Sequence, residues 1–238
     1  MAQGRLDEAQ VVLDASLRDL EARGHAGELP GLYALRNRAL LLESRHRLPE
    51  ALEVFRDLVE RAERTLEPSD ALIPTAMSEL GALLEALGEG EEGERWARAA
   101  HEHARETLGP DSPYATIVEM RLGMVLQKRK KNDEAAPVLR HAVERLTEQF
   151  GESHTNTLQA MDALAHALLA RGEIDEAEEL GAARSRADSR APSARHGRGS
   201  RSRRVSDWRS CSRRAGRRKS SSRARGRHPL PGRSGHDR

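Results

Sequence analysis

The sequence predicts an all-α fold: an α-solenoid of antiparallel helix pairs, followed by a disordered C-terminal tail. Three observations carry this prediction. Related segments recur every 42 residues through most of the chain, and apolar residues inside each unit follow the i, i+3, i+4, i+7 spacing of amphipathic helices. The helical pattern ends after Ala182, where a segment rich in Arg and Ser begins.

The 42-residue period defines the units. Segments related to "GRLDEAQVVL" begin at residues 4, 46, 88, 130 and 172, with no insertion between them. One position in these segments always holds a small residue: Ala9, Ala51, Gly93, Ala135 and Ala177. A second small position is followed three residues later by leucine, and its members are Ala39, Gly81, Gly123 and Ala165. Small residues on both sides of a turn let two helices approach closely.

The first unit in the chain is a half repeat at 1–23, which consists of a second helix without the first helix of its pair. Full repeats are predicted at about 30–65, 72–107 and 114–149, and a truncated repeat at 156–182, so that the array covers 1–182. No alternating run of strand type interrupts them. Pro137, just inside a second helix, is expected to delay or bend that helix.

The links between units are predicted to stop one helix and start the next. Gly109 and Gly151 are placed as C-terminal caps. Asp111 or Ser112 then supplies an N-cap oxygen, and Pro113 a favourable first-turn φ.

The units resemble the tetratricopeptide repeat family, in the 42-residue form of kinesin light chains and of bacterial signalling proteins. The resemblance covers about residues 4–182. It rests on the linker "LGPDSPYAT", similar to that form's Leu-Gly-x-Asp-His-Pro linker with Ser112 in place of His, and on Leu122-Gly123, Leu126, Ala135, Leu139 and Ala142. The family's aromatic position in the first helix is occupied here by Leu35, Met77, Glu119 and Met161.

The resemblance implies a non-catalytic scaffold that binds a peptide or partner protein in a concave groove lined by first helices. Carrying over the family's groove positions gives Tyr33, Arg36, Asn37, Leu40, Ser78, Glu79, Ala82, Arg121, Met124, Lys128, Asp162 and His166. The family's peptide-holding asparagine is present at Asn37 and replaced by Glu79, Arg121 and Ala163 in the later repeats. Bacterial members often follow a protein kinase domain, so the resemblance also implies an association with a kinase.

A literal G-x-G-x-x-G motif, the fingerprint of dinucleotide-binding sites, lies at Gly88, Gly90 and Gly93. It follows a leucine-rich helix where a nucleotide site would need a strand, and its glutamates would repel a pyrophosphate. We interpret it as a turn between paired helices. Because of its glycines, the second full repeat is expected to be the most loosely packed.

The two parts of the chain carry opposite net charges. Residues 1–182 carry a net charge of −14, and residues 183–238, with 18 Arg and one Lys, carry +16. The segment 183–238 has too few apolar residues to fold alone and is predicted to be disordered. Two interpretations of this segment stay open: it binds nucleic acid through contacts with phosphates, or a reading-frame change has replaced the true continuation of the chain.

The open ends of the array are expected to favour self-association, and the chain could be a fragment of a larger protein.

Other classes of function find little support. The single cysteine, Cys211, excludes an intrachain disulfide, and no stretch reaches the roughly 20 apolar residues of a membrane span. The start lacks the pattern of a signal peptide, so a cytoplasmic protein without membrane association is expected. His101 and His103 point in different directions on a helix, and no catalytic constellation is recognisable, so no enzyme activity, metal or cofactor is predicted.

Overall fold

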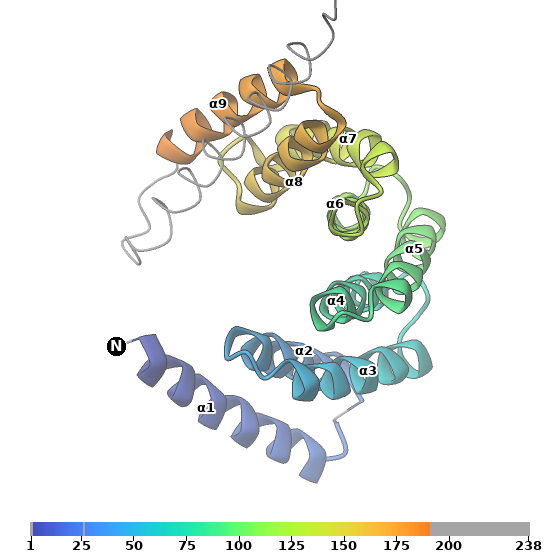
Figure 1. Cartoon of the computed structure of the whole chain (residues 1–238). Coiled ribbons are helices and arrows are strands. Elements are labelled where there is room, and N and C mark those ends of the chain that lie inside the picture. The colour runs from blue at the N-terminus through green and yellow to red at the C-terminus, as the bar shows by residue number, and fades with distance from the viewer. Residues whose placement is uncertain (1, 26, 191–238) are drawn as a thin grey trace, which may run out of the picture.

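The computed structural model describes residues 2–25 and 27–190, and these residues form helices and turns without a strand. The helices are α1 (Ala2–Ala22), α2 (Leu29–Ser44), α3 (Leu48–Thr65), α4 (Leu72–Leu87), α5 (Gly90–Thr107), α6 (Pro113–Lys128), α7 (Asn132–Phe150), α8 (Thr155–Arg171) and α9 (Ile174–Arg190). The chain winds into an open arc in which α2, α4, α6 and α8 lie on the inner side (Figure 1). The predicted all-α solenoid is confirmed.

Each full repeat pairs a first helix with a second helix: α2 with α3, α4 with α5, and α6 with α7. The two small positions lie where the paired helices meet. Ala39, Ala51 and Ala135 are fully buried. At Gly123, an added Cβ would lie 2.6 Å from Leu139 Cγ, so the leucine of the second helix fills the space that the glycine leaves. Helix packing thus follows the repeat that the sequence displays.

The turns are built largely as predicted, with one difference. Gly151 is the C-cap of α7, and Gly109 follows Leu108, the C-cap of α5; both glycines have positive φ, and Pro113 starts α6. The N-cap prediction is wrong, because the Ser112 side chain caps no backbone N–H and the Asp111 carboxylate instead binds Arg145 at 2.5 Å. The Arg145 guanidinium group forms a stronger hydrogen bond with this carboxylate than a neutral backbone N–H would form.

Pro137 does not delay its helix, which starts at Asn132 and continues through it. A proline at this position leaves the Asp133 carbonyl without its usual helical donor. Arg171 Nη1 lies 3.5 Å from that carbonyl oxygen and 3.4 Å from the Asp133 carboxylate. The fourth repeat therefore supplies a donor for the carbonyl that the proline leaves open.

The prediction that the second full repeat is loosely packed is also wrong. A Cβ on Gly93 would lie 2.6 Å from the Gly81 carbonyl oxygen, and one on Gly81 would lie 2.8 Å from the Gly93 oxygen. The backbones of α4 and α5 touch at these two glycines, closer than any residue with a Cβ would allow. The glycines mark tight contact between the helices.

Helix α9 runs past the predicted end of the array at Ala182 and includes residues assigned to the tail. Arg184, which stands where the preceding second helices have Ala100 and Ala142, forms an ion pair with Asp162 of α8 at 2.9 Å. Ala187 is fully buried, and its carbonyl accepts a hydrogen bond from Ser153 Oγ. The predicted disorder and nucleic-acid binding of the tail otherwise fall on residues 191–238, outside the described residues.

None of the described helices is long and apolar enough to span a lipid bilayer.

Candidate protein-binding groove

The inner side of the arc contains a cavity of about 240 Å³ between the first helices of four successive repeats. Its lining comes from α2, α4, α6 and α8: Leu40, Glu43, Glu79, Ala82, Met120, Arg121, Met124, Val125, Lys128 and Gln159. Successive first helices present equivalent faces because the 42-residue period keeps them in register. The cavity therefore crosses repeat boundaries.

The floor of this groove is apolar. Leu40, Ala82 and Met124 are half-buried, and each comes from a different repeat. Met120 and Val125 beneath them are 2% exposed. Covering apolar surface of this kind with an apolar side chain removes it from water and lowers the free energy.

A buried carboxylate joins three repeats beside this floor. Glu79 is 4% exposed and accepts a hydrogen bond from Arg36 Nε of α2 at 2.9 Å. Arg121 Nη2 of α6 lies 3.0 Å from the same carboxylate. One carboxylate thus holds two guanidinium groups, and the cluster of Arg36, Glu79 and Arg121 has a net charge of +1.

The remaining polar lining is open to solvent. Lys128 and Glu43 are exposed, and neither has an ion-pair partner among the residues that the structure describes. Gln159 of α8 is also exposed. These side chains are available to a ligand, in contrast to Glu79.

Six of the predicted groove residues meet in the cavity: Leu40, Glu79, Ala82, Arg121, Met124 and Lys128. Arg36 reaches the site through Glu79 without lining the cavity.

The other predicted residues lie elsewhere. Ser78 is fully buried and donates to the Thr75 carbonyl at 2.8 Å, so its side chain is not accessible. Asp162 is held by Arg184. Tyr33 is 47% exposed, and Asn37 and His166 are exposed outside the cavity lining.

The sequence prediction missed Glu43, Met120, Val125 and Gln159. Two of them had a usable signal. Glu43 follows Leu40 by three residues and so shares its helix face. Gln159 occupies the repeat position of Tyr33, which was predicted, three periods earlier in the chain.

Outside the groove, a second buried carboxylate connects the second and third repeats. The Glu94 side chain on α5 is 10% exposed and pairs with Arg98 at 2.9 Å, Arg129 at 2.8 Å and Lys131 at 2.7 Å. Burial alone would raise the pKa of Glu94, but hydrogen bonds from Lys131, Arg98 and Arg129 lower it to about 2. Arg129 and Lys131 belong to the turn between α6 and α7, so the cluster fixes that turn against α5.

We expect Glu94→Gln to lower the free energy of unfolding by about 1.5 kcal/mol at pH 7. The pKa shift would permit about 3 kcal/mol, and solvent around the partly exposed Arg98 and Lys131 screens part of it. Because the folded-state pKa is depressed, this stabilisation is present above the unfolded pKa and is lost as pH falls from about 4.5 towards 2. Urea unfolding of both proteins between pH 7 and pH 3 measures the difference.

The control for Glu94 is Glu134→Gln, which removes a carboxylate that pairs with Arg98 and is 53% exposed. Its loss should stay below about 0.5 kcal/mol, as for an exposed pair. A Glu94→Gln difference that stays constant down to pH 3 would show that the carboxylate charge is not responsible.

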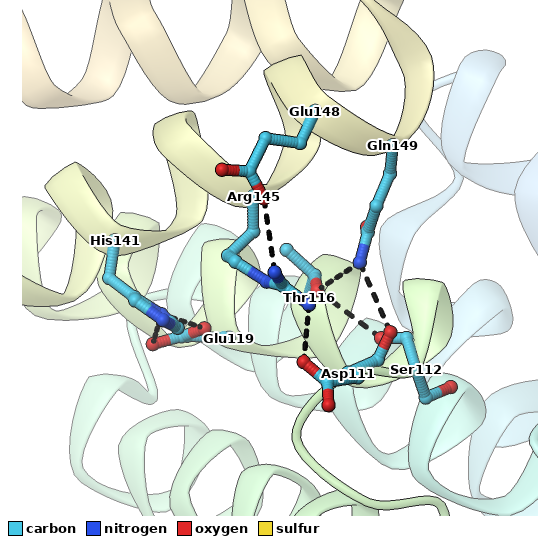
Figure 2. Close-up of polar contacts among 8 residues, drawn as sticks. All are labelled: Asp111, Ser112, Thr116, Glu119, His141, Arg145, Glu148 and Gln149. Carbon is cyan, nitrogen blue, oxygen red and sulfur yellow. Dashed lines mark hydrogen bonds and ion pairs between the residues drawn. The ribbon is translucent and has the colours of Figure 1, made fainter.

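The turn before α6 is fixed in a comparable way by the end of α7 (Figure 2). Arg145 binds both Asp111 and Glu148, and Gln149 Nε2 donates to the Asp111 carbonyl at 3.2 Å. Nearer the middle of the helices, His141 Nδ1 lies 2.9 Å from Glu119, which stands where the other repeats have buried Leu35, Met77 and Met161. The histidine supplies a polar partner for a carboxylate in an otherwise apolar position.

The surroundings of His101 and His103 on α5 indicate a structural role for both side chains. His103 lies 2.8 Å from the Pro68 carbonyl oxygen of the preceding link. Burial lowers the pKa of half-buried His101, partly offset by the negative charge of Glu119. Within residues 2–25 and 27–190, no three His, Cys, Asp or Glu side chains are arranged to hold a metal ion.

Comparison with known proteins identifies related folds. Two family models described as tetratricopeptide repeat match residues 114–186 and residues 32–71 and 75–114. Comparison with curated protein sequences found no significant match.

Solved structures have similar folds. The crystal structure of BtubC (BKLC) from P. vanneervenii has a TM-score of 0.68 at 18% identity, covering 97% of this chain and 96% of that one. A Podosopora anserina protein described as a putative kinesin light chain with nearly identical TPR-like repeats has a TM-score of 0.60 at 19% identity, covering 81% of this chain and 92% of that one. At these identities the similarity concerns the fold.

Proposed function

Since this chain belongs to the tetratricopeptide repeat family, whose repeats form protein-interaction scaffolds, we propose that it binds a protein segment in the groove between α2, α4, α6 and α8. The family membership confirms the resemblance seen in the sequence, and the similar solved folds agree with its kinesin-light-chain-like form. The observation that carries the proposal is the half-buried apolar floor of Leu40, Ala82 and Met124. It is flanked by the charges of Glu43 and Lys128, which form no ion pair within residues 2–25 and 27–190.

The size of the groove indicates what enters it. A volume of about 240 Å³ is below the ~300 Å³ at which pockets for drug-sized molecules begin. We therefore expect one or two apolar side chains of a peptide to fill the floor, while its backbone and polar groups meet Lys128, Glu43 and Gln159. A kinase, which the family resemblance implies as an associate, is one class of protein that could supply such a segment.

The test starts from peptides selected on the purified full chain from a random display library. Met124→Glu places a charge on the apolar floor and is expected to weaken the selected peptides at least about tenfold, a change of ~1.4 kcal/mol in binding free energy. Lys128→Glu should alter affinity in a direction that follows the charge of the peptide. Fluorescence anisotropy with labelled peptides measures both.

Lys130→Glu is the matched control, since Lys130 is an exposed lysine in the turn after α6 and is not part of the groove. It makes the same charge change as Lys128→Glu and should leave binding unchanged. Circular dichroism melts verify that the variants fold. Peptides that bind Met124→Glu as tightly as the unaltered protein would place the binding surface elsewhere.

A further inference from the structure

The charged side chains that line the groove are distributed unevenly over its helices (Figure 1). On α2 the charged lining residue is Glu43, one residue before the helix ends. On α6 the charged lining residues are Arg121 and Lys128, and Lys128 is the last residue of that helix. Helix α8 contributes Gln159, which is uncharged. The lining is therefore negative on the α2 side and positive on the α6 side.

Helix α4, which lies between α2 and α6, does not change this distribution. Its lining residues are Glu79 and Ala82. The Glu79 carboxylate is buried, accepts a hydrogen bond from Arg36 and lies 3.0 Å from Arg121. Two guanidinium groups thus compensate one carboxylate, and the excess positive charge adds to the α6 side because Arg121 lines the cavity and Arg36 does not.

The two exposed charges belong to this chain and are not part of the repeated pattern. Glu85, one period after Glu43, is not a lining residue. Its Oε2 would lie 2.5 Å from a Cβ on Gly90, so its carboxylate points towards the start of α5. One period before Lys128 the chain has Ala86. A negative charge over α2 and a positive charge over α6 are therefore specific to these two repeats.

Both charges are available to a ligand. Glu43 and Lys128 are exposed, and neither forms an ion pair with another residue of the part that the structure describes. A bound segment that places opposite charges against them is favoured, and one that places like charges there is rejected.

Resting on the function proposed above, we propose that the groove selects a partner segment with charges of opposite sign on the two sides of an apolar residue. A Lys or Arg of the segment lies against Glu43, and an Asp or Glu lies against Lys128. The apolar residue between them covers the floor formed by Leu40, Ala82 and Met124. The order of the two charges then fixes the direction in which the segment crosses the helices.

The positions of the helices set the spacing of the two charges. Packed helices lie about 8–10 Å apart, so the two steps from α2 to α6 span about 16–20 Å. An extended chain advances about 3.3 Å per residue. The basic and acidic residues of the segment are therefore about four to six residues apart, since their side chains also contribute to the reach.

The chain's own segment 191–238 is a poor occupant on the same grounds. It contains two acidic residues, Asp207 and Asp237, among many arginines. Its excess of positive charge would meet Arg121 and Lys128 as well as Glu43. The charge pattern of the groove thus favours a partner protein.

The probes are labelled peptides that were selected on the full chain and are weakened by Met124→Glu. Each should carry a basic and an acidic residue on opposite sides of an apolar residue. Glu43→Lys should weaken them about fivefold, because an attraction between exposed charges is replaced by a repulsion. Replacing the basic residue of the peptide with Glu should restore the affinity to within about twofold, as fluorescence anisotropy would measure.

The double variant Glu43→Lys with Lys128→Glu tests the order of the charges, because it leaves the net charge of the protein unchanged. It should prefer peptides whose basic and acidic residues have been exchanged, by at least about fivefold, whereas the unaltered protein should prefer the original order. Both preferences should shrink in 1 M NaCl, where screening acts over about 3 Å.

Glu53→Lys is the matched control for Glu43→Lys, because Glu53 is an exposed glutamate on α3 and is not part of the groove. Lys130→Glu serves in the same way for Lys128→Glu. Both controls should leave the affinities unchanged.

The outcomes separate this proposal from the function on which it rests. Peptides that are weakened by Met124→Glu but respond to Glu43→Lys no more than to Glu53→Lys would overturn the selection by charge and leave groove binding intact. Selected peptides that all ignore Met124→Glu would overturn both. If a labelled peptide of residues 191–238 bound as tightly as the selected peptides and was weakened equally by Met124→Glu, the chain's own segment would be the occupant, which would overturn the assignment to a partner.

Discussion

Gly93→Ala is expected to lower the free energy of unfolding by about 2 kcal/mol, although alanine is the better helix former. The added Cβ would lie 2.6 Å from the Gly81 carbonyl oxygen and 2.9 Å from the Glu85 backbone nitrogen. Both atoms belong to the backbone of α4, so the whole helix must move. Such overpacking costs up to about 3 kcal/mol, and the gain in helix propensity returns about 1 kcal/mol. Urea unfolding of both proteins measures the difference.

Gly123→Ala is the matched control, because it adds the same methyl group at a small position where other repeats carry Ala39 and Ala165. Its Cβ would meet atoms of the Leu139 side chain. A side chain can change rotamer more easily than a helix can shift, so the loss should be below about 1 kcal/mol. Equal losses at the two glycines would show that contact with backbone is not what distinguishes them.

The double variant Gly81→Ala with Gly93→Ala tests whether the glycines act as one contact. Once α4 and α5 have separated to admit the first methyl group, the second meets less resistance. The combined loss should therefore be smaller than the sum of the single losses. An additive result would mean that each methyl group is accommodated by a separate local change.

The fold could be predicted because repetition makes weak signals agree. A single small residue followed by a leucine says little, but the same pattern at four positions 42 residues apart locates helix contacts and turns together. The close approach of helices that the small positions predict is present at Gly81 and Gly93, whereas the loose packing expected from the glycine-rich segment is wrong, because glycines can mean either a poorly filled space or a close contact between backbones. Only the positions of the opposing carbonyl oxygens distinguish these cases.

The end of the array was misplaced for a different reason. Arg184 breaks the pattern of small residues seen at Ala100 and Ala142, and composition alone favours a tail from that point. Its charge is compensated by Asp162 on α8 and by Asp188 one turn later. An ion pair between helices depends on their relative placement, which the periodicity of apolar residues does not report.

The sequence predicts which residues lie at the groove, but it does not show which of their side chains pair with one another. The sequence suggested Arg36, Glu79 and Arg121 as contacts for a partner, and the structure brings them together with one another. Glu79 and Arg121 are one period apart, so they occupy equivalent places on neighbouring first helices. Opposite charges at equivalent positions of neighbouring repeats can indicate an ion pair between those repeats. Transferring the groove positions of a family one residue at a time does not use this signal.

Glu79→Ala is expected to lower the free energy of unfolding by about 3 kcal/mol. Removing one member of a buried ion pair typically costs about 3–5 kcal/mol, and the lower end applies because the side chains of Arg36 and Arg121 are each 24% exposed. The loss should shrink in 1 M NaCl, where screening acts over about 3 Å and weakens the repulsion between the two guanidinium groups. Urea is the suitable denaturant because, unlike guanidinium chloride, it leaves the ionic strength unchanged.

A triple variant with Arg36→Met, Glu79→Leu and Arg121→Met separates the charge from the packing. Apolar side chains of similar length remove both the carboxylate and the cations it holds, so stability should return to within about 1 kcal/mol of the unaltered protein. If the triple variant folds stably but no longer binds groove-selected peptides that Glu79→Ala still binds, the arginines contact the partner directly. If it binds them with unchanged affinity, the cluster serves to align α2, α4 and α6, and recognition depends on Leu40, Ala82, Met124 and Lys128.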